Sequence, residues 1–219
     1  MPRALFEKKG NAVWISHLDL MRVFQRAFKR AGLQLTHTQG FNPRPSVSIA
    51  LPLSVGIESC CELLDFELEG PKVNNEEILN RLNNNLVDGV KILAVYDDFN
   101  KIKNLAFLDC VLTLEYDNGI PDGCENQIKE LCGREEVVVE KRTKNGPKPE
   151  NIIPMIRKLD VITENDHVIT LKSRICCQNP ALNPMQMAVA IEGFIPEMKP
   201  DFVKSCRSEI YDSHERVFR

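Results

Sequence analysis

Apolar and polar residues alternate through several short stretches of the first hundred residues, which is the two-residue period of a half-buried strand. From this pattern we predict extended segments at 4–15, with a turn at 9–11, and at 33–38, 46–51, 60–69 and 90–96. Two intervening stretches repeat their apolar residues every three or four positions, as an amphipathic helix does. The first half of the chain therefore alternates strands with two helices.

The first predicted helix has both of its ends marked in the sequence. Ser16 is a good N-cap, and Asp19, three residues on, can reach back to form a short capping box. Gly32 supplies the C-terminal stop. The predicted buried stripe of this helix is Leu20, Phe24, Ala27, Phe28 and Ala31. The second helix, at 73–86, has an inner stripe of Ile78, Leu79, Leu82 and Leu86.

The second half of the chain repeats this pattern more loosely. We predict strands at 106–116, 137–142 and 204–211, a strand pair or one long bent strand at 161–176, and a helix at 124–131. A last helix begins at Asn183, an N-cap followed by a proline at the first helical position, and its buried residues are Met187, Ala188 and Ile191. The basic Gly/Pro segment at 141–149 is expected to be an exposed, mobile loop.

The order β-α-β-β-α-β lets two helices cover one face of a four-stranded antiparallel sheet, which is the ferredoxin-like pattern. We therefore predict an α+β protein of two tandem ferredoxin-like (βαββαβ) domains with antiparallel sheets. The first domain spans 1–99 and the second, looser one spans 105–219, with a polar linker at 97–104. The length of 219 residues suits two such domains.

Composition narrows the class of protein. With 43% hydrophobic and 27% charged residues, the chain has the make-up of a globular protein rather than a disordered or fibrous one. No apolar run approaches the roughly 20 residues of a membrane span, and the first residues do not form a leader segment. We expect a cytoplasmic protein that has no membrane partner.

Eight cysteines raise the question of a metal or cluster site. No two of them form C-x-x-C, and there is no C-x-x-x-C-x-x-C run of the kind that holds a radical-generating iron–sulfur cluster. The neighbouring cysteines at 60–61 and 176–177 each place one sulfur inside and one outside a strand. We therefore expect buried, reduced thiols, no metal and no cofactor.

Charge is distributed unevenly along the chain. Residues 1–57 contain eight basic residues against Glu7 and Asp19, a net charge of +6, which leaves −9 for the remainder. Phosphates attract clustered cations, and unpaired bases of RNA stack on aromatic side chains. The predicted nucleic-acid-binding residues are Arg22, Arg26, Lys29 and Arg30 on the first helix and Gln39, Phe41, Asn42 and Arg44 in the following loop. The prolines on both sides of Arg44 stiffen that loop. The alternative to this hypothesis is that the basic helix face is merely solvated and that Phe41 packs in the core.

Two further functions compete with RNA binding. For acid–base catalysis the weak candidates are His17, in the first turn of the helix, and His37, close to the loop. Neither histidine lies at a sequence spacing that requires a catalytic role, and a structural role for His17 is the simpler interpretation. A protein-docking module is the other possibility, with the acidic residues of the 58–69 segment facing a basic partner, although such acids usually form a solvated sheet face.

Four stretches carry a resemblance to a known family: WISHLDLMR at 14–22, KRAG at 29–32, TQGFNPRP at 38–45 and LPLSVGIES at 51–59. Together they resemble the radical SAM-linked domain family of bacteria, whose function is not established. Its members occur alone or fused behind a B12-binding radical SAM protein, and are often encoded near ribonuclease G and ribosomal-protein genes. A looser, architectural resemblance links the chain to the tandem ferredoxin-like RNA-processing endonucleases of CRISPR systems.

The resemblance implies a partner, because any radical chemistry would belong to another protein that carries the cluster cysteines. We therefore expect an accessory protein, not itself an enzyme, that binds tRNA, ribosomal RNA or a ribonucleoprotein and acts with a radical SAM protein in trans. A metal-independent RNA endonuclease and a docking module for the radical SAM partner are the alternatives.

Overall fold

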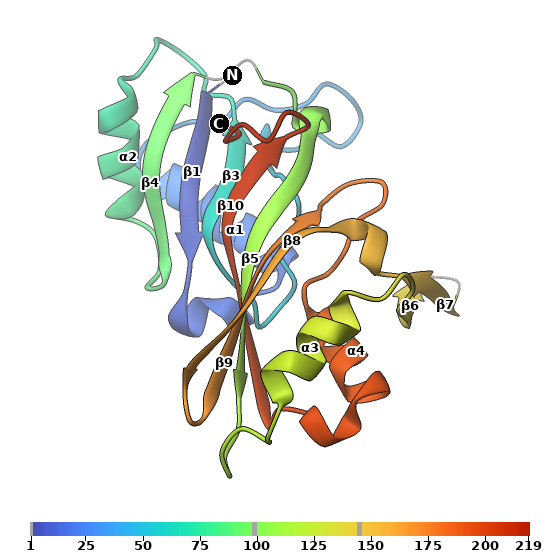
Figure 1. The fold of residues 1–219 in the computed structure, drawn as a ribbon. Coiled ribbons are helices and arrows are strands. Elements are labelled where there is room, and N and C mark those ends of the chain that lie inside the picture. The colour runs from blue at the N-terminus through green and yellow to red at the C-terminus, as the bar shows by residue number, and fades with distance from the viewer. Residues whose placement is uncertain (1, 98–99, 144–145) are drawn as a thin grey trace. The chain divides into compact units, whose positions relative to one another are not determined.

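In the computed structural model the chain divides into two compact units, one made of residues 1–104 with Phe218 and Arg219, the other of residues 105–217 (Figure 1). The structure describes residues 2–97, 100–143 and 146–219. Within these residues each unit combines antiparallel strands with two α-helices, so the protein is a mixed α/β chain. We refer to them as unit 1 and unit 2.

Unit 1 is built on an antiparallel sheet. Its strands are β1 (Pro2–Lys8), β2 (Val47–Ile49), β3 (Glu58–Phe66) and β4 (Val90–Asp97). Strand β1 pairs with both β3 and β4, and β2 pairs with β3, which gives the order β4-β1-β3-β2. At the β1–β3 pair, Arg3 lies opposite Asp65 and forms a bidentate ion pair with it at 2.6 and 3.0 Å.

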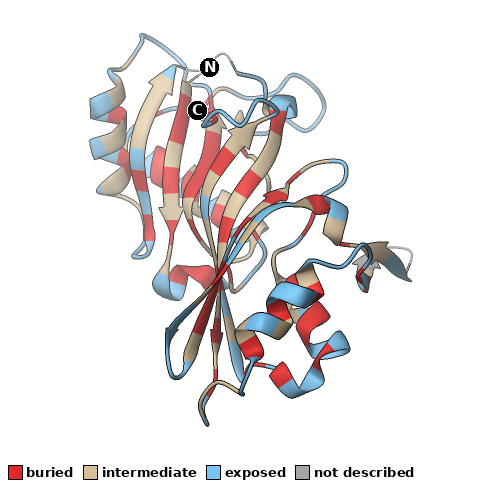
Figure 2. Cartoon of the chain, in the orientation of Figure 1, coloured by how far each residue is buried: buried red, intermediate tan, exposed pale blue. Residues whose placement is uncertain are grey.

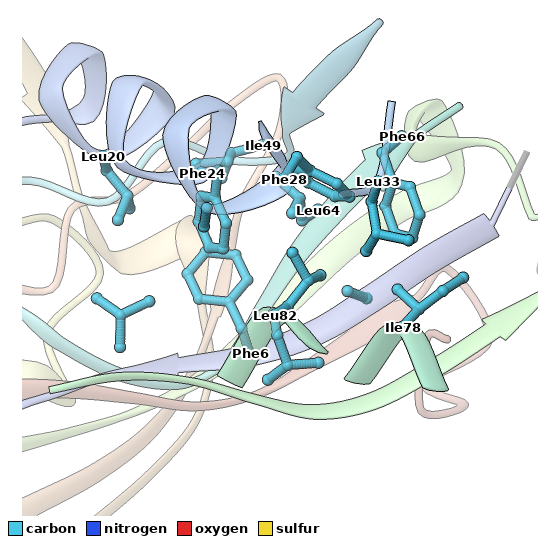
Figure 3. Close-up of a cluster of buried hydrophobic side chains, with 14 of the residues drawn as sticks. Phe6, Leu20, Phe24, Phe28, Leu33, Ile49, Leu64, Phe66, Ile78 and Leu82 are labelled. Atoms are coloured by element: carbon cyan, nitrogen blue, oxygen red, sulfur yellow. The ribbon is translucent and has the colours of Figure 1, made fainter. Parts of the chain in front are cut away.

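Two helices, α1 (His17–Arg30) and α2 (Asn75–Asn83), contribute to one hydrophobic core in unit 1. Figure 3 shows Leu20, Phe24 and Phe28 pointing from α1 toward the strands. The rings of Phe24 and Phe6 meet edge to face with centroids 4.9 Å apart. Ile78 and Leu82 of α2 join the same cluster, so both helices pack on the same layer of side chains.

Ser16 is the N-cap of α1, as the sequence predicts, but the Asp19 carboxylate bonds to the Ser16 hydroxyl rather than to its backbone N–H as in a capping box. The Ser16 hydroxyl accepts a hydrogen bond from the Asp19 N–H and donates one to the Asp19 carboxylate. The predicted stripe is buried, apart from Ala31, which is only partly buried. With its inner face fixed to the core, α1 must direct its opposite face to solvent.

Two predicted strands of unit 1 are wrong in extent. Residues 33–38 form only isolated bridges, Leu35 to Leu68 and His37 to Pro45, because Pro43 and Pro45 have no N–H to continue a ladder. The segment at 46–51 is reduced to the three residues of β2, and Leu51, with φ of 47°, turns the chain out of the strand direction.

The predicted extended segment at 4–15 is also shorter. Strand β1 ends at Lys8, and Gly10, with φ of 54°, opens a 3₁₀ turn, η1 (Gly10–Trp14). The Lys8 ammonium is buried and donates to the carbonyl oxygens of Val13 and Ile15 at 3.2 and 2.9 Å. Burial lowers the pKa of Lys8, although Glu62 opposes this shift. Lys8 thus ties η1 to the sheet.

Unit 2 contains four antiparallel strands that pair in the order β10-β5-β9-β8. Its strands are β5 (Leu105–Glu115), β8 (Ile156–Asn165), β9 (Val168–Cys176) and β10 (Phe202–Asp212). Helices α3 (Cys124–Cys132) and α4 (Met185–Phe194) contribute buried residues to this unit. Buried and partly buried positions alternate along most of β5 (Figure 2), as expected for a strand covered on one face. Three short 3₁₀ turns complete the elements: η2 (Ile102–Asn104), η3 (Ile153–Met155) and η4 (Pro196–Met198).

The segment predicted at 161–176 is a strand pair, β8 and β9.

Three expectations in unit 2 are corrected. The strand near 137–142 is β6 (Val138–Thr143), which pairs with β7 (Gly146–Asn151) in a separate two-stranded sheet. The 141–149 segment is therefore part of a hairpin rather than a loop, although Lys144 and Asn145 lie outside the described residues. In α4, Pro184 is the N-cap residue and Ala190, not Ala188, is buried.

All eight cysteines are free thiols. Cys61, Cys110, Cys124 and Cys177 are buried, whereas the other four are partly buried. Burial raises the pKa of Cys110 and Cys177 to about 11, so both thiols are protonated at neutral pH and make poor nucleophiles. Within the described residues, no group of three or more His, Cys, Asp or Glu side chains has the arrangement of a metal site.

A search of the described helices finds none with the length and hydropathy needed to cross a membrane. The polar linker predicted at 97–104 includes residues 98 and 99, which lie outside the described residues, and its other end is the 3₁₀ turn η2 at the end of unit 1.

Candidate nucleic-acid interface

The exposed face of α1 carries four cations, and two of them are occupied within unit 1. Arg22 forms an ion pair with Asp19 at 2.7 Å, one helical turn away. Arg30 donates to the main-chain carbonyl of Asn85, just beyond the end of α2. A guanidinium held in this way has less freedom to bind a phosphate, so these two residues are the weaker members of the predicted set.

Arg26 and Lys29 differ from their neighbours. Both are exposed, and neither side chain has a hydrogen bond or an ion pair with any residue that the structure describes. They lie three residues apart, so they share one side of the helix. Two unneutralised charges at this spacing leave a local positive potential that a ligand can use.

The loop after α1 is closed by its own backbone. The Thr38 N–H donates to the Arg44 carbonyl at 2.8 Å, and the Arg44 N–H donates to the Thr38 hydroxyl at 3.0 Å. Gln39, Phe41 and Asn42 lie between these anchors and are exposed. Phe41 is 104% exposed, so it does not pack in the core. The Arg44 guanidinium has no partner among the described residues.

A cavity of about 600 Å³ connects α1 to the base of this loop. Arg26 and Lys29 line one side, and His37 and Pro45, next to the anchors of the loop, line another. His37 and Pro45, at the two ends of the loop, therefore share this space with Arg26 and Lys29. The predicted loop residues themselves, Gln39, Phe41, Asn42 and Arg44, do not line it.

The two histidines are not brought together. His17 is the first residue of α1, whereas His37 borders the cavity beside the last turns of the helix, roughly 15 Å along the helix axis. The His37 Nδ1 lies 4.0 Å from a Glu69 carboxylate oxygen, and both side chains are about half exposed. Because no base and acid pair is assembled from these histidines, we base no catalytic proposal on them.

Trp14 is a candidate binding residue that the sequence analysis missed. Its side chain is 71% exposed, and Leu18, in the first turn of α1, is 68% exposed. A Cβ atom at Gly56 would lie 3.5 Å from the Trp14 ring, so the indole rests against the backbone there. The strand-like alternation of Val13 and Ile15 in the sequence would have placed Trp14 outward, although the segment is in fact the 3₁₀ turn η1, with Val13 buried and Ile15 partly buried.

Fold and site together define a mixed α/β protein. Its unit 1 presents exposed aromatic side chains and cations that have no partner among the described residues. The chain belongs to the bacterial family described as "Uncharacterized protein conserved in bacteria (DUF2344)", whose model matches residues 2–184. A search of curated proteins gives no significant match.

Solved structures provide a likeness at the level of the fold. The chain is similar to a chain of a Cbf5–Nop10–Gar1 complex, with a TM-score of 0.54 and 7% identity over 95% of this chain and 48% of that chain. A chain from an H/ACA RNP bound to a substrate RNA containing 2'-deoxyuridine aligns with a TM-score of 0.48 and 7% identity over 94% of this chain and 46% of that one. The protein thus spans about half the length of each.

Proposed function

We propose that the chain consists of two tandem ferredoxin-like domains, at 1–99 and 105–219, and that the first binds RNA. The strand orders β4-β1-β3-β2 and β10-β5-β9-β8 support the fold proposal, since a βαββαβ chain with this order is ferredoxin-like. In the second domain the β6–β7 hairpin is an insertion between α3 and β8.

The observation that carries the RNA proposal is Phe41, a fully exposed ring on a loop that is closed at its base. The same loop carries Arg44, whose guanidinium has no partner among the described residues. A large apolar ring held in water has an unfavourable hydration free energy, and a stacked base removes that cost. Arg44, Arg26 and Lys29 then meet the phosphates on either side of the stacked base.

An unpaired strand suits this surface better than a duplex does. The narrow major groove of an A-form helix excludes side chains, whereas splayed bases of loops and ends stack on aromatic rings. We propose single-stranded segments of tRNA or ribosomal RNA as the ligand. Gln39 and Asn42, exposed beside Phe41, have amides that can hydrogen-bond to base edges.

We propose further that the protein is a non-catalytic accessory of a radical SAM enzyme. The four motif stretches that resemble the radical SAM-linked family support this, and so does the absence of cluster-type cysteine spacing from the sequence. The enzyme should co-purify with the full chain from lysate treated with ribonuclease, and its consistent absence there would contradict the partnership.

Phe41 provides the test of RNA binding. Phe41→Ala should weaken binding of a single-stranded RNA by roughly 5- to 150-fold, which corresponds to about 1–3 kcal/mol of stacking. Phe41→Trp should retain binding, since it keeps an aromatic surface. Fluorescence anisotropy of a labelled oligonucleotide measures both variants. Equal affinities for wild type and Phe41→Ala would remove the stacking role.

A further inference from the structure

The RNA contacts proposed for the surface do not account for the apolar residues that line the cavity beside α1. Its floor is apolar, formed by Phe28, Leu33 and Leu35, which are buried, with Pro45 at the side. A volume of about 600 Å³ falls within the range of small-molecule binding sites. An apolar floor of this kind suits the flat face of an aromatic ring system.

Besides His37, two sets of polar side chains line this cavity. Arg26 and Lys29 provide two positive charges on one side, and Gln25 and Gln34 provide side-chain amides. Neither amide forms a hydrogen bond with any described residue. Each amide offers both a donor and an acceptor, the combination that a nucleobase edge requires.

From this arrangement we propose that the cavity is a subsite for one unpaired nucleotide. The base lies on the apolar floor with its edge facing the amides of Gln25 and Gln34, and its phosphate lies against Arg26 and Lys29. The inference deepens the RNA-binding function and rests on it: the base of the loop borders the cavity, so a neighbouring base of the same strand can stack on Phe41.

A free phosphate is an alternative ligand that is also negatively charged. It differs from a nucleotide in how much affinity the apolar floor of the cavity contributes. A phosphate would use only Arg26 and Lys29 and would leave the apolar floor in contact with water. A nucleotide covers that floor, so its base and its phosphate should each add affinity.

The experiment compares AMP, adenosine and inorganic phosphate as ligands of the full chain, by saturation-transfer NMR and competition. AMP should bind at least roughly tenfold more tightly than adenosine or phosphate, because it makes both sets of contacts. Phosphate binding as tightly as AMP, or the absence of saturable AMP binding, would overturn the subsite.

Variants separate the two sets of contacts. Lys29→Gln should reduce the affinity for AMP and leave the affinity for adenosine unchanged. Gln34→Trp, at an exposed position, should fill the cavity and abolish binding of both, with an unchanged melting temperature showing that the chain is folded. Lys91→Gln, on the exposed side of β4, is the matched control and should bind as wild type does. AMP binding that survives Gln34→Trp would contradict the assignment.

The same preparations distinguish failure of the subsite from failure of RNA binding. A chain that binds single-stranded RNA but not AMP would contradict the subsite alone. Saturable, Gln34-dependent AMP binding without RNA binding would contradict the RNA-binding function and leave the cavity as a nucleotide site.

Discussion

Reversing both unpaired cations of α1, in Arg26→Glu with Lys29→Glu, should lower the affinity for single-stranded RNA by roughly 100-fold or more. Each substitution removes a favourable phosphate contact and adds a repulsive charge within a few ångströms of the strand. Neither side chain has an intramolecular partner among the described residues, so the fold loses no ion pair. Anisotropy titrations at low salt, where surface charges are least screened, measure the loss.

Lys91→Glu with Lys103→Glu is the matched control, because it makes the same change in net charge at two exposed lysines elsewhere in unit 1 that have no ion pair among the described residues. It should lower the affinity only by the general effect of a more acidic protein. If the control weakened RNA binding as much as the α1 pair, binding would depend on net charge and the assigned surface would be wrong. Arg22→Glu alone should have a smaller effect than Arg26→Glu, because Asp19 already neutralises Arg22.

Phe24→Ala should lower the free energy of unfolding of unit 1 by about 3–5 kcal/mol. Phe24 is fully buried and meets Phe6 edge to face, so truncation leaves a cavity beneath α1 and removes a ring contact. This is a large share of the roughly 5–15 kcal/mol that stabilises a typical domain. Urea unfolding followed by circular dichroism measures the change.

Phe41→Ala is the natural comparison, since the same residue type is truncated at an exposed position. It should change the free energy of unfolding by less than about 0.5 kcal/mol. Truncation of Phe24 should therefore lower the free energy of unfolding, whereas truncation of Phe41 should lower the affinity for RNA. A large loss of stability from Phe41→Ala would contradict its exposed placement.

Helix α1 was predictable because its determinants are local. The Ser16 cap, the Asp19 carboxylate that bonds to it and the buried stripe are all encoded within sixteen residues, and their spacing fixes which face is exposed. Even the pairing of Arg22 with Asp19 follows from a three-residue separation on a helix.

The rest of the site depends on contacts between distant residues, which the sequence pattern does not report. Arg30 is held by a carbonyl 55 positions away, at Asn85. The cavity exists because the 33–37 segment, which alternates like a strand, crosses beside α1 with only sparse backbone bonds. Periodicity shows which face of a segment is buried but not which other element covers it.

The β6–β7 hairpin illustrates the same limit in unit 2. Pro147 and Pro149 argue against a strand, since neither can donate to a ladder. In a sheet of two strands, however, each strand keeps one free edge, so a proline is tolerated wherever its nitrogen faces outward. Whether a strand tolerates proline depends on how many neighbouring strands pair with it, and the sequence does not show that number.

The binding of single-stranded RNA by unit 1, through Arg26, Lys29 and Arg44 together with the exposed ring of Phe41, can be tested by the salt dependence of wild-type binding. Three phosphate contacts, from Arg26, Lys29 and Arg44, predict a slope of log K against log salt of roughly −2 for a single strand. Affinity should then fall about 20-fold between roughly 50 and 200 mM salt. A slope near zero, or no binding of single-stranded RNA at the lower salt, would contradict the account.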